Sequence, residues 1–120
     1  MKATCYCGTV ELDITLANDI TDINRCTCSF CNRRGAKVVT LFAEDLKLVR
    51  GEDHLTLYQL GSKTAKHYFC KTCRIYTHHQ KRLDCNEIGV NIATIEGLHP
   101  QGFERIPWVE GMNYASEMRS

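Results

Sequence analysis

Several features that would assign a location or a partner are missing from this sequence. No segment is long and apolar enough to span a membrane, and the first residues contain no apolar stretch of the kind found in secretory signals. Lys and Arg number 15 against 14 Asp and Glu, so the formal net charge is only +1. Such a chain lacks the overall positive charge that favours nucleic-acid binding. We therefore expect a cytoplasmic protein whose partner is neither a membrane nor a nucleic acid.

The sequence also lacks the pattern of a long helix. No stretch of ten or more residues is amphipathic at helical spacing, and there is no internal repeat or low-complexity run. Val10, Leu12 and Ile14 instead alternate with polar residues, which is typical of a half-buried strand. A chain of 120 residues that is 43% hydrophobic predicts a single domain, residues 1–120, with an ordinary core. Strands are expected over residues 9–15, 20–25, 38–42, 46–49, 55–60, 65–70, 75–80 and 87–94. We therefore predict a mainly β fold with very little helix, limited to a short turn that Gly35 caps.

Eight cysteines are present, a lower share than is typical of a secreted disulfide scaffold. In a cytoplasmic protein, where thiols stay reduced, clustered cysteines indicate metal binding more than disulfides. They form a C-x-C pair (Cys5, Cys7), a C-x-C-x-x-C stretch (Cys26, Cys28, Cys31), a C-x-x-C pair (Cys70, Cys73) and a lone Cys85.

The C-x-C-x-x-C stretch is the strongest candidate for chemistry. Residues two apart in a strand point to one side, and residues three apart in a helical turn share a face. A strand that enters a helical turn at Cys28 would therefore aim the sulfurs of Cys26, Cys28 and Cys31 at one point. Three thiolates leave one zinc coordination position open, as in catalytic zinc sites. The alternative is a closed site with Cys85 as fourth ligand, which would account for all eight cysteines as two sets of four.

The two cysteine pairs predict a structural zinc site. Cys70 and Cys73 follow a strand at the tip of an expected hairpin, which is the arrangement of a zinc knuckle. A thioredoxin-like redox pair would need a βαβ pattern, and the sequence has none. Cys5 and Cys7 alone are a weak signal, since two buried cysteines would look the same. Spacing does not determine which pairs combine.

Several segments together resemble the glutathione-dependent formaldehyde-activating enzyme family, which also includes centromere protein V. The resemblance continues through Val90-Asn91 and Leu98 to Val109-Glu110-Gly111, and so covers nearly the whole chain. Its core is Cys5-Tyr6-Cys7-Gly8-Thr9-Val10, the residues from Cys26 to Ala36, and His67-Tyr68-Phe69-Cys70-Lys71-Thr72-Cys73.

This resemblance implies a β-tent, a fold of small antiparallel sheets with zinc knuckles, and two zinc ions. It assigns a closed structural site to Cys5, Cys7, Cys70 and Cys73. It assigns the open, catalytic site, for which we expect partial zinc occupancy, to Cys26, Cys28 and Cys31, with glutathione as the thiol co-substrate at the fourth position. Cys85 matches no ligand of the family. The family usually has Gly directly after the C-x-x-C, where this chain has Arg74, so we expect Arg74 to adopt a positive φ.

The predicted activity is that of a zinc-dependent carbon–sulfur lyase acting on a thiol–aldehyde adduct such as S-hydroxymethylglutathione. Arg25, Arg33 and Arg34 flank the three-cysteine stretch and could bind glutathione carboxylates, although a solvated basic face would have the same sequence. His67 could act as an acid or base, but we favour a hydrogen-bonded strand histidine. A non-catalytic zinc scaffold that binds a protein or nucleic acid is the alternative function. Whether the chain forms a homodimer stays open.

Overall fold

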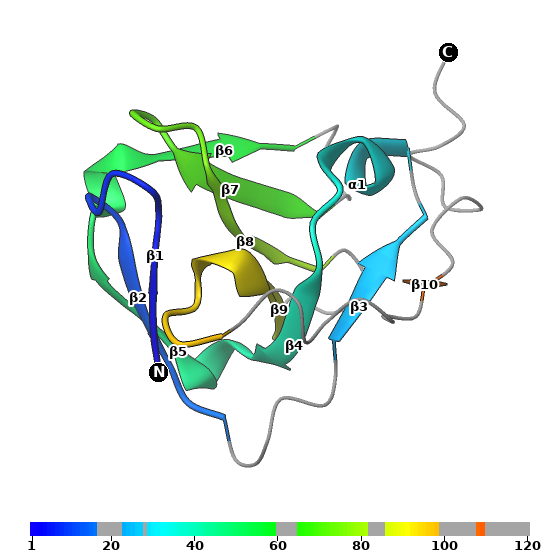
Figure 1. The fold of residues 1–120 in the computed structure, drawn as a ribbon, viewed down its shortest axis with the longest axis horizontal. Helices are drawn as coiled ribbons and strands as arrows, with labels where there is room; N and C mark the ends of the chain where they lie inside the picture. Colours follow the sequence, from blue (N-terminus) through cyan, green and yellow to red (C-terminus); the bar gives the residue numbers. More distant parts are fainter. Residues whose placement is uncertain (17–22, 28, 60–64, 82–85, 99–107, 110–120) are drawn as a thin grey trace.

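The computed structural model describes residues 1–16, 23–27, 29–59, 65–81, 86–98 and 108–109. About half of the described chain is in short strands (Figure 1). The strands are β1 (Lys2–Thr4), β2 (Glu11–Ile14), β3 (Ile23–Cys26), β4 (Val38–Phe42), β5 (Leu46–Arg50), β6 (Leu55–Tyr58), β7 (Lys66–Cys70), β8 (Tyr76–Gln80), β9 (Glu87–Asn91) and β10 (Trp108–Val109). The helical elements are α1 (Ser29–Arg34) and the 3-10 turns η1 (Ala43–Asp45), η2 (Glu52–His54) and η3 (Ile92–Thr94).

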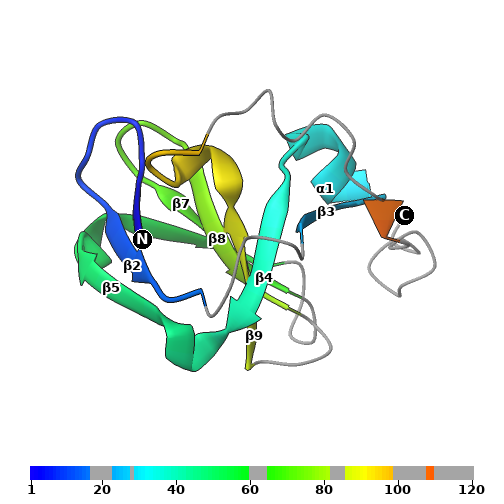
Figure 2. The same ribbon diagram turned by 60° about the horizontal axis from the view of Figure 1, so that its bottom comes forward.

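These strands form two sheets. One has three strands in the order β1-β2-β5, and the other has seven in the order β10-β3-β4-β9-β8-β7-β6. All the pairings are antiparallel except that of β10 with β3. The three-stranded sheet and α1 lie at opposite ends of the molecule in both views (Figures 1 and 2). Within the described ranges, none of the helices has the length and apolar character needed to cross a bilayer.

The core lies between the two sheets. Leu12 and Ile14 of β2 are fully buried, whereas Asp13 between them is exposed, so the predicted alternation is confirmed. The larger sheet contributes the buried side chains of β4 and β9. The main cluster contains Ala3, Leu12, Ile14, Ile23, Val39, Leu41, Ile88, Val90, Ile92 and Ile95. A second cluster surrounds Cys5, Val10 and Cys70, and therefore lies beside the cysteine pairs.

The mainly β fold with little helix is confirmed, and the differences from prediction have local causes. Strand β1 was not predicted, because three residues are too few to show a period; it pairs with β2 from Lys2 opposite Asp13. The strand expected over residues 87–94 ends at Asn91, whose side chain accepts a hydrogen bond from the Ala93 N–H and starts the turn η3. Gly35 ends α1 with φ +70, as predicted for a C-terminal cap.

The turn between β7 and β8 contains a strained residue. Arg74 has φ 67. Among the residues that the structure describes, it is the only one other than glycine with a positive φ. Its N–H donates to the carbonyl of Cys70, which closes the C-x-x-C turn. A side chain in the left-handed region costs roughly 1–2 kcal/mol. The expectation taken from the family's usual glycine is therefore confirmed.

We predict that Arg74→Gly is neutral or stabilises the protein by up to about 1 kcal/mol, because relief of the left-handed strain is partly offset by the flexibility of glycine. Urea unfolding of the zinc-loaded protein measures the change. The matched control is Lys71→Gly, an exposed position of the same turn without positive φ, which should lose about 0.5–1 kcal/mol. An equal loss of unfolding free energy in both variants would show that Arg74→Gly does not relieve backbone strain.

Candidate functional site

Two turns that are distant in sequence bring four cysteine sulfurs together. Cys5 and Cys7 lie in the turn between β1 and β2, and Cys70 and Cys73 begin and end the turn after β7. All four sulfurs lie within 4.8 Å of one another. The Sγ of Cys7 is 3.6 Å from that of Cys5 and 3.7 Å from that of Cys70. The geometry thus combines the C-x-C with the C-x-x-C, a choice that the spacing left open.

This cluster fits a tetrahedral zinc ion. Zinc–sulfur bonds of about 2.3 Å place the ligand sulfurs roughly 3.8 Å apart, close to the separations observed here. Backbone N–H groups support the sulfurs: that of Val10 donates to Cys5 Sγ (3.3 Å) and that of Thr72 to Cys70 Sγ (3.4 Å). Such hydrogen bonds stabilise sulfur in its charged form. The four cysteines could therefore hold one metal ion.

Two thiols of the cluster, those of Cys5 and Cys7, differ in their pKa. Burial raises the pKa of Cys5 to about 11. Hydrogen bonds from the side chain and backbone of Thr9 lower the pKa of the exposed Cys7 to about 6. Metal ligands must be thiolates, so the proton of the buried Cys5 is harder to displace on metal loading than that of Cys7.

The three-cysteine stretch lies elsewhere, at the junction of β3 and α1. Strand β3 ends at Cys26 and α1 begins at Ser29, so a strand does run into a helical turn as predicted. Cys31 lies within α1 and is half-buried, as is Cys26. Cys28 and Cys85 lie outside the described residues. The open site and the role of Cys85 therefore stay predictions.

Arg34, one helical turn further along α1, contacts Cys31. Its Nη2 donates to Cys31 Sγ (3.5 Å) and its Nη1 to Nδ1 of His67 on β7 (2.9 Å). The guanidinium carbon lies 3.6 Å from the centre of the Tyr76 ring. These contacts fix a cation beside the Cys31 sulfur and join α1 to the larger sheet.

A β-bulge in β8 places the groups beneath Arg34. Phe69 pairs with Tyr76 and Tyr68 with His78, so Thr77 is an extra residue between them. Residues 76 and 79 would face opposite sides of a regular strand, but the bulge turns both to the same side. The Tyr76 hydroxyl consequently contacts Nδ1 of His79.

Burial determines the protonation states of the Tyr76 phenol and the His79 imidazole. It raises the pKa of Tyr76 and lowers that of His79 well below 6.5, so the phenol donates and a neutral imidazole accepts. The His79 ring also lies 5.2 Å from the ring of His67, which is 4.5 Å from Phe30 of α1. Gly89 makes room for the His79 ring, because a Cβ at position 89 would clash with that ring.

The predicted arginines have different surroundings. Arg25 is half-buried on β3, Arg33 is exposed in the last turn of α1, and Arg34 already uses both terminal nitrogens within the protein. His67 is buried and hydrogen-bonded, as favoured from the sequence. Neither Tyr76 nor His79 was predicted as a site residue, because a bulge leaves no signal in the hydrophobic pattern.

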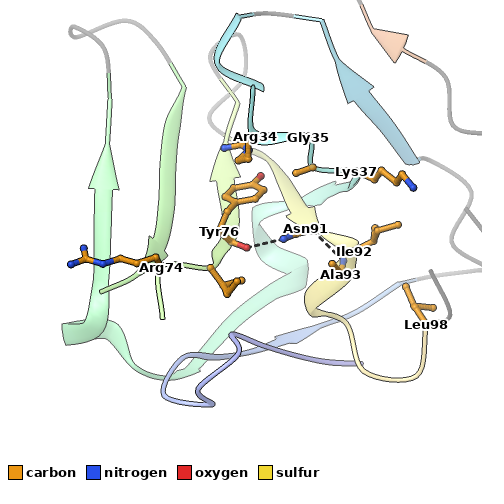
Figure 3. Close-up of a pocket in the computed structure, with 11 residues that line it drawn as sticks. Arg34, Gly35, Lys37, Arg74, Tyr76, Asn91, Ile92, Ala93 and Leu98 are labelled. Atoms are coloured by element: carbon orange, nitrogen blue, oxygen red, sulfur yellow. Dashed lines mark hydrogen bonds between the residues drawn. The ribbon is translucent and has the colours of Figure 1, made fainter. Parts of the chain in front are cut away.

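A cavity of about 550 Å³ opens beside Arg34, between the end of α1 and η3 (Figure 3). Tyr76 and Asn91 line its inner side, and Leu98 lines it from the segment after η3. Arg34 thus separates the Cys31 sulfur from a space large enough for a small molecule.

We predict that Cys70→Ser removes one equivalent of zinc and most of the stability, because a closed cysteine site contributes on the order of 10 kcal/mol of apparent binding energy. Cys31→Ser should keep most of the stability. Elemental analysis and thermal unfolding of both variants measure these effects. Equal losses of melting temperature would contradict a structural role confined to the four-cysteine cluster.

Arg34→Met should destabilise the protein by about 1–3 kcal/mol. The substitution keeps an apolar stem on the Tyr76 ring but leaves His67 Nδ1 without its donor and removes the cation–π contact. Chemical unfolding measures the loss, and hydrogen exchange should accelerate in α1. The exposed neighbour Asn32, changed to Ala, is the control and should shift stability by less than about 0.5 kcal/mol. Indistinguishable variants would mean that Arg34 does not anchor the helix.

Comparison with known proteins finds a family match that includes both the four-cysteine cluster and the three-cysteine stretch. A family profile described as "Glutathione-dependent formaldehyde-activating enzyme" matches residues 1–106, a span that contains all eight cysteines. A crystal structure of a Rhodobacter sphaeroides protein is similar at 53% sequence identity and a TM-score of 0.85, over 91% of this chain and 100% of that one. The chain therefore belongs to the glutathione-dependent formaldehyde-activating enzyme family.

Proposed function

We propose that this protein is a zinc-dependent carbon–sulfur lyase acting on the adduct of an aldehyde with glutathione or another thiol, of which S-hydroxymethylglutathione is the type. One observation carries the proposal. The cluster of Cys5, Cys7, Cys70 and Cys73 is complete by itself. Cys26, Cys28 and Cys31 are therefore left for a separate site. Of these, Cys26 ends β3 and Cys31 lies in α1, at the other end of the molecule from the three-stranded sheet (Figure 1).

In this proposal the four-cysteine cluster holds a structural zinc ion. Cys26, Cys28 and Cys31 would hold a second zinc, which would act as a Lewis acid toward the thiol of the co-substrate. When bound there, zinc lowers the pKa of a thiol from about 8.5, so that a thiolate is present at neutral pH. Three thiolates and one divalent cation carry a net charge of −1, which disfavours a further thiolate. The Arg34 cation at 3.5 Å from Cys31 Sγ offsets that charge.

The bond changes are simple. In the synthetic direction the thiolate sulfur attacks the carbonyl carbon of the aldehyde and forms the carbon–sulfur bond. The π electrons of the carbonyl move to its oxygen, which takes up a proton to give the hydroxyl. In the reverse direction the hydroxyl loses its proton, the carbonyl re-forms and the thiolate leaves. No oxidant or reductant is required.

The remaining residues bind and position the thiol. The exposed Arg33 and the half-buried Arg25 are proposed to bind the carboxylates of glutathione, since arginine pairs well with carboxylate groups. Arg34 is better suited to hold Cys31, because both its terminal nitrogens are already hydrogen-bonded within the protein. Helix α1 thus contributes a metal ligand and the cations beside it.

The test is the rate of exchange between ¹³C-formaldehyde and S-hydroxymethylglutathione, followed by NMR with and without the zinc-loaded protein. We expect the wild-type protein to accelerate the exchange. Cys31→Ser should reduce that acceleration at least tenfold, and Cys85→Ser should leave it unchanged. Zinc content is measured alongside and should be two per wild-type chain. Normal binding of zinc and glutathione without acceleration would favour a non-catalytic scaffold. Loss of one zinc in Cys85→Ser would show a closed second site and contradict the proposal.

A further inference from the structure

The cavity beside Arg34 has walls that are mostly apolar. Ile75 lines it although its side chain is 38% exposed, and the Tyr76 ring forms its inner side. An exposed isoleucine in a concavity is a surface that an apolar ligand would remove from water. The other apolar lining residues are Ala36, Ile92, Ala93 and Leu98.

Several polar atoms of the inner wall already have partners, although the buried Nε of Arg34, which also lines the cavity, has none among the described residues. The amide nitrogen of Asn91 donates to the Tyr76 carbonyl (2.9 Å), and its amide oxygen accepts from the Ala93 N–H (3.1 Å), as Figure 3 shows. The Ile92 N–H donates to the carbonyl of Lys37 (3.0 Å), and the Tyr76 hydroxyl is paired with His79. A ligand group rich in amides or carboxylates would leave its own polar atoms unpaired against this wall.

Lys37 and Arg74, which also line the cavity, do not offer a charge partner at its inner wall. In Figure 3 the side chains of Lys37 and Arg74 both extend away from Tyr76 and Asn91. Arg34 also lines the cavity, and its terminal nitrogens are bonded to His67 and Cys31. The inner cavity is therefore poorly suited to the charged ends of a tripeptide such as glutathione, and well suited to hydrocarbon.

Position and size connect the cavity to the proposed chemistry. The Arg34 guanidinium both lines the cavity and donates to Cys31 Sγ, and the Gly35 N–H at the cavity edge donates to the Cys31 carbonyl. A dry cavity of about 150 Å³ suffices to bind benzene. A volume of about 550 Å³ greatly exceeds what a hydroxymethyl group needs.

We propose that this cavity is a subsite for the apolar substituent of an aldehyde larger than formaldehyde. The substrates would be hemithioacetals of the form S–CH(OH)–R, in which R is an alkyl or aryl group that enters the cavity. The inference rests on the proposed function and narrows its substrate class. The bond changes are those given above, with R in place of one hydrogen of formaldehyde.

The first experiment measures binding without turnover, using S-methyl-, S-butyl- and S-hexylglutathione in calorimetric titrations of the zinc-loaded protein. Each methylene buried in an apolar site tightens binding by about three- to fourfold. We therefore expect the dissociation constant to fall by at least tenfold from S-methyl to S-hexyl. Equal affinities across the series would overturn the subsite and leave the proposed function standing.

A matched pair of variants locates the effect. Ala93 is exposed on η3 and lines the cavity, so Ala93→Leu should fill part of it and reduce the preference for S-hexyl over S-methyl to less than threefold. Ala43 is exposed on the 3-10 turn η1 and is not among the lining residues, so Ala43→Leu is the control and should keep the full preference. A preference unchanged in Ala93→Leu would place the alkyl group elsewhere and contradict the proposal.

The cavity can also be tested if no glutathione derivative binds, an outcome that would count against the proposed function. 1-Hexanol is then titrated alone and followed by NMR of the Ile92 and Leu98 methyl groups. Shifts at these methyls that are lost in Ala93→Leu would keep the apolar site. Their absence in wild type would overturn it.

Discussion

The fold depends on the convergence of four cysteine sulfurs from two turns more than sixty residues apart in sequence. The first turn belongs to the three-stranded sheet, and the second lies at the tip of β7 in the larger sheet. Few apolar side chains surround this junction compared with the main core. Joining the two sheets here through a metal would stabilise the contact without a large apolar interface, which suits a small domain.

At the other end of the molecule, side-chain contacts rather than a cysteine cluster hold α1 against the larger sheet. Helix α1 has only six residues and would not be stable alone. Phe30 packs on His67 and on Tyr58, and Arg34 reaches across to Tyr76 and His67. The helix is therefore held by aromatic and polar contacts with β6, β7 and β8, and the Cys31 sulfur is positioned by the same contacts.

Most of the strands and the capping Gly35 were predictable, because each depends on a few neighbouring residues, whereas the positive φ of Arg74 was expected from the family's usual glycine. The composition of the four-cysteine cluster was not decided by spacing; it followed from the family resemblance and is seen in the geometry. The roles of Tyr76 and His79 could not be predicted, since they depend on one extra residue at Thr77 and on the room left by Gly89. Both features concern pairing between strands, which a linear pattern does not report.

Because one guanidinium forms both a wall of the cavity and the hydrogen-bond partner of Cys31, the two regions cannot evolve independently. A change that reshapes the cavity around Arg34 also alters the environment of the Cys31 sulfur, and a change in the β8 bulge moves both. Substitutions here should be non-additive, so their effects would depend on the order in which they were acquired. Divergence within this family would then proceed through paired changes on α1 and β8 more readily than through single ones.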